Sequence, residues 1–278
     1  MHTSVVSAVP SPGGRTTVVN TSRGRPVGVI CSLATGGHRE LLAESAPTMQ
    51  AYALRHGWDV VLSCEELSER PPAWSKVRLI RELMATYEYV FWVDADALIV
   101  DLDADVLDEI GPEADIWFAR HSQERDPNAT VLNAGIILAR STEWVGELLD
   151  AVWAATQFID HNWWENAALL DLLGYSLESP FPRLRASEWN LRVGELRLAW
   201  NSVPGYCEAD CPAINHHARS DHDDFARRLA AMASDRRNVI ARWPGDFGHL
   251  PLERGQRSRF ERELAALRRV YSKLRRRS

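Results

Sequence analysis

The chain has 278 residues, of which 45% are hydrophobic and 25% are charged, and its formal net charge is -6. This acidic balance argues against nucleic-acid binding by the protein as a whole, and the apolar content is enough to form the core of a large globular domain. No window approaches the roughly 18 consecutive apolar residues that a membrane-spanning helix needs. We therefore expect a soluble, cytoplasmic protein.

The predicted elements alternate between strands and helices. Residues 1–25 are rich in small polar residues, Pro and Gly, which predicts a disordered lead-in rather than a signal peptide. The elements expected after it are strand 26–33, helix 38–56, strand 58–63, helix 73–86, strand 89–100, strand 115–119, strand 130–138, helices 142–158 and 162–173, and strand 213–215. This alternation is typical of an α/β fold with a mostly parallel central sheet flanked by helices.

We expect one domain over residues 26–250, because no strong linker or internal repeat divides this region. Residues 251–278 are basic and predict a C-terminal helix whose cations favour the negative end of the helix dipole. A membrane or polyanion patch is the alternative for this tail.

Two carboxylates, Asp94 and Asp96, interrupt the apolar run 89–100. Removing water from an ionised carboxylate is costly unless a partner compensates the charge. On a strand both side chains would point the same way, at the carboxyl end where open α/β sheets bind ligands. Two hard oxygen ligands there suit magnesium or manganese, which would bring diphosphate oxygens with it. The alternative is a solvated acidic turn.

Two other acid-based sites fit the sequence poorly. A calcium loop counted from Asp94 has Ile99 where Gly is needed and Asp105 where Glu is needed. A haloacid-dehalogenase-type phosphatase needs a lysine between its two acidic pairs, and the chain has lysine only at Lys76 and Lys273.

The four cysteines are too few for a disulfide framework in a chain of this length. Cys31 and Cys64 lie in apolar, strand-like runs and are expected to be core thiols. Cys207 and Cys211 have the spacing of half a zinc site, but the chain has no second pair to complete it.

Several motifs together resemble a GT-A glycosyltransferase of the family that holds plant xyloglucan xylosyltransferases, galactomannan galactosyltransferases and fungal α-mannosyltransferases. The order and spacing of the motifs carry the resemblance, which runs from about Val27 to Ala218. The motifs are Tyr52–Asp59, Trp74–Lys76, Asp-x-Asp at 94–96, Leu132–Leu138, Trp164–Leu170 and Ile214–Ala218. The resemblance implies a single Rossmann-like GT-A domain.

The resemblance also implies a metal site. Asp94 and Asp96 would bind Mn²⁺ or Mg²⁺, and His216 would be the third protein ligand through one ring nitrogen. The adjacent His217 competes for that role. Lys76 would point its ammonium group at the diphosphate or the donor sugar.

The expected catalytic residues are Lys76, Glu165 and Asn166. Glu165 and Asn166 stand where the family usually has Asp-Gln, with the same functional groups on side chains of different length. Glu165 would lie beneath the anomeric carbon, and Asn166 would orient donor or acceptor. The expected donor-binding residues are Ser32, Ala34, Thr35, Lys76, Asp94, Ala95, Asn133, Ala134 and Gly135. The expected acceptor-binding residues are Trp163, Trp164 and Trp189, for which core packing is the alternative.

The activity implied by the resemblance is metal-dependent, retaining transfer of a hexose or pentose from a UDP- or GDP-sugar to a hydroxyl of a small-molecule or glycan acceptor. Attack from the leaving-group face and a covalent intermediate on Glu165 both remain open. The family usually continues with Phe-Ala-Gly after the histidine at 216, and this chain has His217-Ala-Arg-Ser220 instead. The lid over the diphosphate is therefore not predicted.

Two alternative functions remain. One is a catalytically silent sugar-nucleotide-binding protein, which the change from Asp-Gln to Glu165-Asn166 keeps open. The other is a metal-dependent nucleotidyltransferase, although no Gly-rich phosphate loop of the usual kind follows the first strand.

Overall fold

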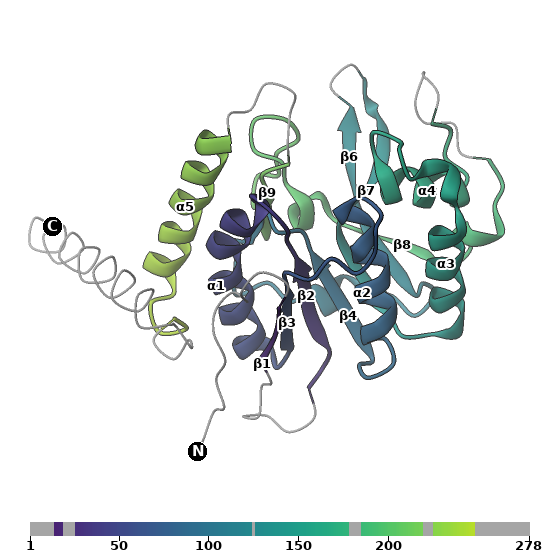
Figure 1. Ribbon diagram of the computed structural model, residues 1–278. Coiled ribbons are helices and arrows are strands. Elements are labelled where there is room, and N and C mark those ends of the chain that lie inside the picture. Colours follow the sequence, from purple (N-terminus) through teal and green to yellow (C-terminus); the bar gives the residue numbers. More distant parts are fainter. Residues whose placement is uncertain (1–13, 19–25, 124–125, 178–184, 219–224, 248–278) are drawn as a thin grey trace, which may run out of the picture.

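The computed structural model describes residues 14–18, 26–123, 126–177, 185–218 and 225–247 (Figure 1). The strands are β1 (Arg15–Val18), β2 (Val29–Leu33), β3 (Asp59–Ser63), β4 (Tyr89–Val93), β5 (Ala97–Ile99), β6 (Ile116–Gln123), β7 (Asp126–Arg140), β8 (Val193–Leu196) and β9 (Ile214–His216). The α-helices are α1 (His38–His56), α2 (Ser75–Leu83), α3 (Glu143–Ala154), α4 (Trp164–Leu172) and α5 (Phe225–Arg242). Short 3-10 helices are η2 (Pro72–Trp74), η3 (Val106–Glu109), η4 (Thr156–Phe158), η5 (Glu188–Asn190) and η6 (Leu198–Asn201). The expected basic helix 251–278 lies outside the described residues.

The described residues form a central sheet with the strand order β1-β3-β2-β4-β7-β6-β8. Strand β2 runs parallel to β3 and β4, and β6 runs parallel to β8. Strand β7 runs antiparallel to both β4 and β6, because β6 and β7 follow one another without an intervening helix. The α/β fold class is confirmed, with a mixed central sheet.

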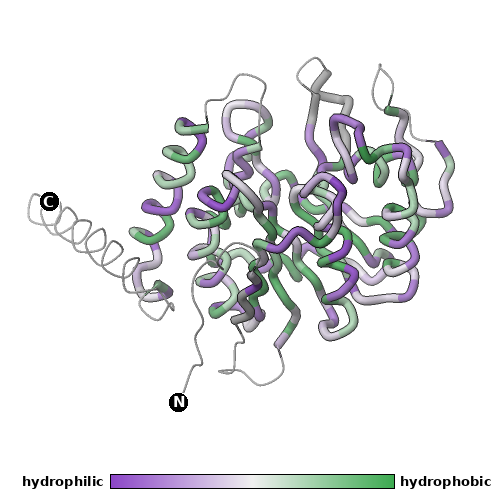
Figure 2. The backbone as a smooth tube through the Cα atoms, viewed as in Figure 1, coloured by the Kyte–Doolittle hydropathy of each residue, from purple (hydrophilic) through white to green (hydrophobic). Residues whose placement is uncertain are grey.

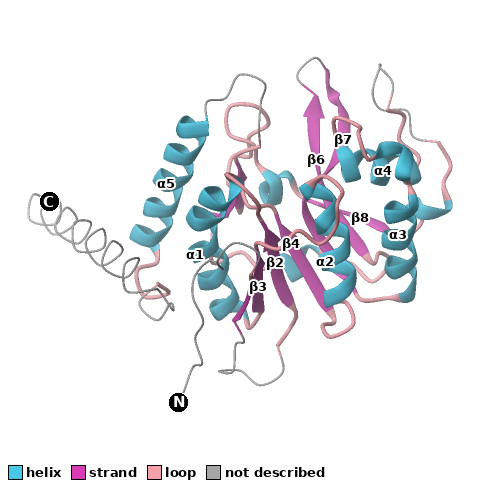
Figure 3. Cartoon of the chain, viewed as in Figure 1, coloured by secondary structure: helices cyan, strands magenta, loops and turns pink. Residues whose placement is uncertain are grey.

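Helices cover both faces of the sheet (Figure 3). Helices α1 and α5 lie on one face, and α2, α3 and α4 lie on the other. Alternate residues of a strand serve the two faces: Phe91 packs in the cluster that contains Tyr52 of α1, whereas Trp92 packs in the cluster that contains Ile80 of α2. Hydrophobic residues accordingly follow the central strands (Figure 2).

The expectation of one strand over residues 89–100 is wrong. Strand β4 ends at Val93, and the chain turns through Asp94–Asp96, where the amide of Ala97 donates to the carbonyl oxygen of Asp94 over 3.0 Å. It then enters β5, which pairs with β9 in a separate two-stranded sheet. A turn, and not the alternation of an extended strand, therefore brings the two carboxylates together.

Apart from short 3-10 helices, two described strands and one described α-helix were not predicted. The edge strand β1 falls within the stretch expected to be a disordered lead-in, and its backbone pairs antiparallel with β3. The structure therefore differs from that expectation at Arg15–Val18, while residues 1–13 and 19–25 lie outside the described residues. Strand β8 and helix α5 are the other two. Helix α5 matters most, because it packs along α1 and reaches the site described next.

Candidate active site

A cavity of about 410 Å³ opens where β2 and β4 end. Fourteen of the expected site residues line it: Ala34, Thr35, Lys76, Asp94, Ala95, Asp96, Asn133, Ala134, Gly135, Trp163, Trp164, Glu165, Asn166 and His216. The structure thus collects residues from β2, α2, β4, β7, α4 and β9 at one edge of the sheet, as open α/β folds do.

Two expected site residues lie elsewhere. Ser32 is fully buried within β2, where its side chain faces the interior of the protein. Trp189 packs against the core that contains α3, with its ring centroid 6.1 Å from that of Trp144. Neither residue lines the cavity, so the expected contacts of Ser32 with the donor and of Trp189 with the acceptor have no support in the geometry.

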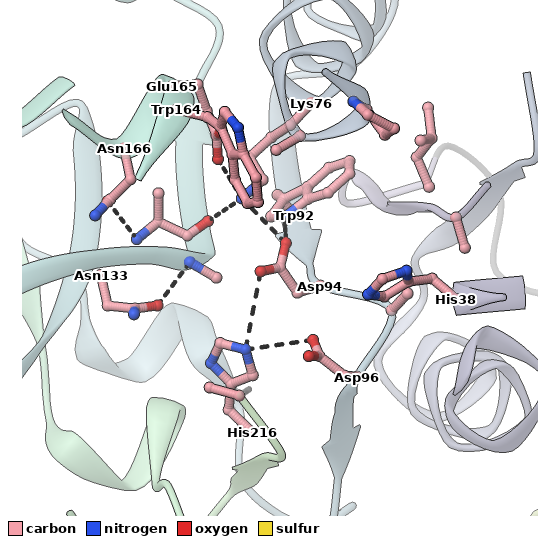
Figure 4. Close-up of a pocket in the computed structure, with 18 of the residues that line it drawn as sticks. His38, Lys76, Trp92, Asp94, Asp96, Asn133, Trp164, Glu165, Asn166 and His216 are labelled. Carbon is pink, nitrogen blue, oxygen red and sulfur yellow. Dashed lines mark hydrogen bonds and ion pairs between the residues drawn. The ribbon is translucent and has the colours of Figure 1, made fainter. Parts of the chain in front are cut away.

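Asp94, Asp96 and His216 form a compact group of potential metal ligands (Figure 4). One ligand atom from each lies within 4.8 Å of the others. The Nε2 atom of His216 is 3.8 Å from Oδ2 of Asp94 and 3.3 Å from Oδ1 of Asp96. Two carboxylate oxygens and one imidazole nitrogen form a donor set that suits Mn²⁺, Mg²⁺ or Zn²⁺.

Each carboxylate of this group is held through its other oxygen. The indole Nε1 of Trp92 donates to Oδ1 of Asp94 over 2.6 Å, and Nζ of Lys76 is 3.1 Å from the same oxygen. The guanidinium of Arg228, from α5, donates to Oδ2 of Asp96 over 2.8 Å. The remaining oxygens are those that face His216, so the protein fixes the two carboxylates in an orientation suited to a shared cation.

Burial and charge act against each other on the protonation of this group. Burial alone would raise the pKa of Asp96, but the charges of His216 and Arg228 lower it to about 2. Burial alone would lower the pKa of His216, but the Asp96 and Asp94 carboxylates raise it above its ordinary value. Without a cation the imidazolium ring itself compensates the carboxylates, and a divalent ion would take over that charge.

The structure separates His216 from its neighbour His217. The Nε2 atom of His217 points away toward Oδ2 of Asp235 in α5, at 3.0 Å. The backbone amide of His217 donates to the carbonyl oxygen of Asp96 over 2.9 Å, which ties β9 to the turn. Of the two histidines, only His216 therefore faces the carboxylates.

Gly135 provides the space that His216 occupies. A Cβ atom at this position would lie 2.3 Å from Cε1 and 2.8 Å from Nδ1 of His216. Because non-bonded carbon atoms do not approach so closely, any other residue at 135 would displace the ring. Gly135 is also an expected donor-binding residue, and it lines the cavity beside the His216 ring.

Lys76 connects Asp94 to Glu165. Its Nζ donates to the carbonyl oxygen of Ala134 over 2.8 Å and to Oε1 of Glu165 over 3.0 Å, and it also contacts Oδ1 of Asp94. An ammonium group has three hydrogens, and these three acceptors use them. Burial would lower the pKa of Lys76, but the carboxylates of Asp94 and Glu165 raise it, so the side chain stays charged.

Glu165 has one oxygen committed and one without a protein partner. Its side chain is 6% exposed, Oε1 accepts from Lys76, and Oε2 has no hydrogen-bond partner. Buried polar atoms are nearly always hydrogen-bonded, and exceptions occur at functional sites. The carboxylate lines the cavity at the start of α4, which makes Oε2 a candidate ligand-facing atom.

Two asparagines hold the backbone of β7 at the cavity wall. Oδ1 of Asn133 accepts from the amide of Gly135 over 2.8 Å, and Oδ1 of Asn166 accepts from the amide of Ala134 over 3.1 Å. In both side chains the oxygen faces the protein backbone. The structure thus gives Asn133 and Asn166 a definite role in shaping the wall.

Trp163 and Trp164 present large apolar surfaces at the cavity. They are 38% and 43% exposed, respectively. Trp164 has φ of 43°, and no other non-glycine residue in the described part of the chain has positive φ. A bulky residue in this region carries strain, which is commonly found at binding sites.

Sequence reasoning missed several residues that line the cavity, among them Trp92, Arg228 and His38. Trp92 could have been found, because it lies two residues before Asp94 and therefore near the end of the same strand. Arg228 had no such signal, since it follows the resembling region on a helix that was not predicted.

The cysteines form no site in the described chain. Cys31, Cys64 and Cys207 are buried, Cys211 is exposed, and none of the four is in a disulfide bond. Among the described residues, the group of Asp94, Asp96 and His216 is the one cluster of potential metal ligands. The expectation that Cys31 and Cys64 are core thiols is confirmed.

Comparison with solved structures decides the fold. A glycosyltransferase involved in glycosylation of the major capsid of PBCV-1 aligns with a TM-score of 0.53 and 14% identity, covering 75% of this chain and all of that one. The fold is that of the GT-A glycosyltransferases. The expected fold is confirmed.

Comparison of sequences confirms the resemblance. The model of the galactosyl transferase GMA12/MNN10 family matches residues 29–114, which contain Lys76, Asp94 and Asp96. The putative glycosyltransferase 7 of Arabidopsis thaliana is 29% identical over 152 residues, covering 52% of this chain and 32% of the relative. Xyloglucan 6-xylosyltransferase 4 of the same plant is 32% identical over 115 residues, covering 37% of this chain and 21% of the relative. The matches thus span about a third or less of these relatives.

Within the described ranges, no helix is both long and apolar enough to cross a bilayer.

Proposed function

We propose that this protein is a metal-dependent glycosyltransferase that moves a hexose or pentose from a UDP- or GDP-sugar to a hydroxyl of a small-molecule or glycan acceptor. The observation that carries the proposal is the pairing of two features in one cavity. One is the group of ligand atoms on Asp94, Asp96 and His216, and the other is the unpartnered Oε2 of buried Glu165. The GT-A fold and the similarity to named glycosyltransferases support the same activity.

Asp94, Asp96 and His216 would hold Mn²⁺ or Mg²⁺. Bound there, the ion would neutralise charge on the diphosphate of the leaving nucleotide. The protein prepares this site by fixing one oxygen of each carboxylate, through Trp92 and Arg228, so that the other stays directed at the cavity. The choice between Mn²⁺ and Mg²⁺ stays a prediction, with the imidazole ligand favouring Mn²⁺.

Arg228 is our candidate for the cation that contacts the diphosphate. Lys76 was expected in that role, but its three hydrogens are directed at Ala134, Glu165 and Asp94. Arg228 lines the cavity, has an unpartnered buried Nε, and has further N–H groups beyond the one that binds Asp96. A guanidinium group matches phosphate oxygens well.

Glu165 would stabilise positive charge on the anomeric carbon in a retaining reaction. Lys76 holds Oε1, and Oε2 of this cavity-lining residue stays buried without a hydrogen-bond partner. The same oxygen could attack the anomeric carbon to give a covalent intermediate, so front-face attack and the two-step route remain alternatives. Lys76 contributes by positioning Glu165 and Asp94.

The donor and the acceptor would occupy different parts of the cavity. Ala34, Thr35 and Ala95 lie near the ends of β2 and β4 and would contact the nucleotide, while the wall of β7 held by Asn133 and Asn166 would face the sugar. Exposed Trp163 and Trp164 would stack on an acceptor sugar. Cytoplasmic localisation and a domain over residues 26–250 stay predictions.

The test is slow hydrolysis of UDP- and GDP-sugars in the presence of Mn²⁺, measured as the release of the nucleoside diphosphate. We expect turnover by the wild-type protein and none above background by Asp96→Asn, because that substitution removes a charged ligand of the proposed ion. Asp150→Asn is the matched control, since this carboxylate is 62% exposed on α3.

A protein that only binds sugar nucleotides would release no nucleoside diphosphate. Wild-type turnover by Asp96→Asn with the metal present would show that the metal assignment is wrong.

A further inference from the structure

Asn201, at the end of η6, joins two residues of the cavity without lining it. Its side chain is fully buried. Nδ2 of Asn201 donates to Oδ1 of Asn133 over 3.0 Å, and Oδ1 of Asn201 lies 2.8 Å from Nδ1 of His216. One amide therefore connects the wall of β7 to the histidine of the proposed metal site.

The backbone amide of Gly135 fixes which atom donates and which accepts in each of these hydrogen bonds. The amide of Gly135 can only donate, so the atom of Asn133 that it contacts must be the oxygen. An oxygen there requires a donor from Asn201, which places Nδ2 of Asn201 toward Asn133. The other end of the Asn201 amide is then the oxygen, and it requires a hydrogen on Nδ1 of His216.

With a cation bound, the imidazole of His216 would be neutral and carry one hydrogen, and with that hydrogen on Nδ1 the lone pair is on Nε2. Nε2 is the atom that faces Asp94 and Asp96. Metal-binding histidines commonly donate their second N–H to a neighbouring group, which fixes the tautomer and the orientation of the ring. The bond from His216 to Asn201 has this arrangement.

The backbone around Asn201 is also held. Nε2 of His121 lies 2.9 Å from the carbonyl oxygen of Asn201, which can only accept. Nε2 of His121 is therefore the donor of this hydrogen bond. On the far side, the amide of His216 donates to the carbonyl oxygen of Ser202 over 2.7 Å. η6 and β9 are thus fixed relative to each other.

We propose that Asn201 is a positioning residue that sets the tautomer of His216, presenting Nε2 to the cation, and that couples this ligand to Asn133. The inference rests on the proposed metal site, and it adds a residue that lies outside both the cavity lining and the residues matched by the family model. A change at Asn201 is expected to act on metal affinity through the orientation of His216.

The test is calorimetric titration of the full chain with Mn²⁺ alone. Asn201→Ala should weaken Mn²⁺ binding on the order of 10- to 100-fold, the usual effect of removing a residue that orients a ligand. Asn201→Asp keeps an acceptor for Nδ1–H but loses the donor to Asn133, so it should weaken Mn²⁺ binding less than Asn201→Ala does. Asn215→Ala is the control, because this amide lies next to His216 on β9 but donates to Asp235.

Equal weakening by Asn201→Ala and Asn201→Asp, or wild-type affinity in Asn201→Ala, would overturn the inference while leaving the metal site in place. Failure of the wild-type protein to bind Mn²⁺ would instead overturn the proposed function, and the inference with it.

A second measurement needs no variant and therefore covers the case in which Asn201→Ala fails to fold. In the Zn²⁺-loaded wild-type protein, nitrogen-15 chemical shifts of His216 should show a protonated Nδ1 and a metal-bound Nε2. A metal-bound Nδ1 would contradict the assignment.

Discussion

Buried and half-buried carboxylates lie at both ends of the central sheet, and the protein compensates their charges differently. Asp115 precedes β6 at the edge where β4 begins, and its side chain is 2% exposed. Oδ1 accepts from Arg140 over 3.2 Å, and Oδ2 accepts from Arg192 over 2.5 Å and from Thr142 over 3.2 Å. The protein therefore satisfies both oxygens.

At the opposite edge of the sheet, only one oxygen of each carboxylate is held by a hydrogen-bond donor of the protein other than a histidine. Asp94 and Asp96 use one oxygen for Trp92 and Arg228 and direct the other toward His216, while Glu165 leaves Oε2 without a partner. Complete compensation is expected of a carboxylate that stabilises the fold. Partial compensation leaves an atom for a ligand, and the position of these atoms is the strongest evidence for the proposed activity.

The largest expected effect is on turnover at Glu165. Glu165→Gln keeps the size of the side chain but removes the negative charge that would face the anomeric carbon. We expect donor hydrolysis to fall on the order of 10²- to 10³-fold, comparable to loss of one key electrostatic contact in other enzymes. Glu147→Gln, at an exposed position of α3, is the control. Unchanged hydrolysis in Glu165→Gln would remove Glu165 from the mechanism.

Asp115 is expected to show the opposite behaviour. Asp115→Asn replaces an accepting oxygen with a donor facing Arg140 or Arg192, and should lower the free energy of unfolding by about 2–3 kcal/mol. Chemical denaturation measures this change. Donor hydrolysis per folded molecule of Asp115→Asn should equal that of the wild-type protein. Loss of turnover without loss of stability in this variant would show that the two edges of the sheet do not differ in function as proposed.

The pH dependence of stability gives a smaller effect at the same residue. Burial would raise the pKa of Asp115, but the hydrogen bonds and charges of Arg192, Thr142 and Arg140 together outweigh it and lower the pKa below its ordinary value. A lowered pKa in the folded state means that the stabilisation is present above the unfolded value and is lost as pH falls through the folded value. Below about pH 4, unfolding of Asp115→Asn should therefore depend less steeply on pH than unfolding of the wild-type protein.

The smallest expected effect concerns the acceptor. Trp164→Ala removes a stacking surface and should raise KM for a glycan acceptor by roughly 3- to 10-fold, which corresponds to the usual 0.5–1.5 kcal/mol of an aromatic contact. Donor hydrolysis without acceptor should not change. Leu191→Ala is the control, because Leu191 is 79% exposed and lies outside the cavity. Equal effects of both variants would argue against an acceptor site at Trp164.

Much of the fold could be predicted because its signals are local. The apolar runs that form β2 and β3, and the helix that begins at His38, follow from residue patterns, and Gly57 ends that helix with φ of 80°. The turn at Asp94–Asp96 could not be predicted, because apolar residues continue on both sides of it. The split into β4 and β5 depends on pairing with β9, more than 100 residues away.

The candidate site divides in the same way. Asp94, Asp96 and His216 could be named from motifs, whereas two of their partners could not. Arg228 and Asn201 reach the site from elements with no motif of their own. The sequence predicts that Lys76 contacts the diphosphate or the donor sugar, whereas in the structure its ammonium group donates to the backbone carbonyl oxygen of Ala134 in β7. No sequence pattern places that carbonyl beside Lys76.

The most direct test of the account is a crystal structure of the protein soaked with Mn²⁺, with the ion located by anomalous scattering. We expect one strong anomalous peak between Oδ2 of Asp94, Oδ1 of Asp96 and Nε2 of His216, at about 2.0–2.3 Å from each atom. Absence of a peak at these three residues at saturating Mn²⁺, or a peak bound through His217 instead, would contradict the central claim.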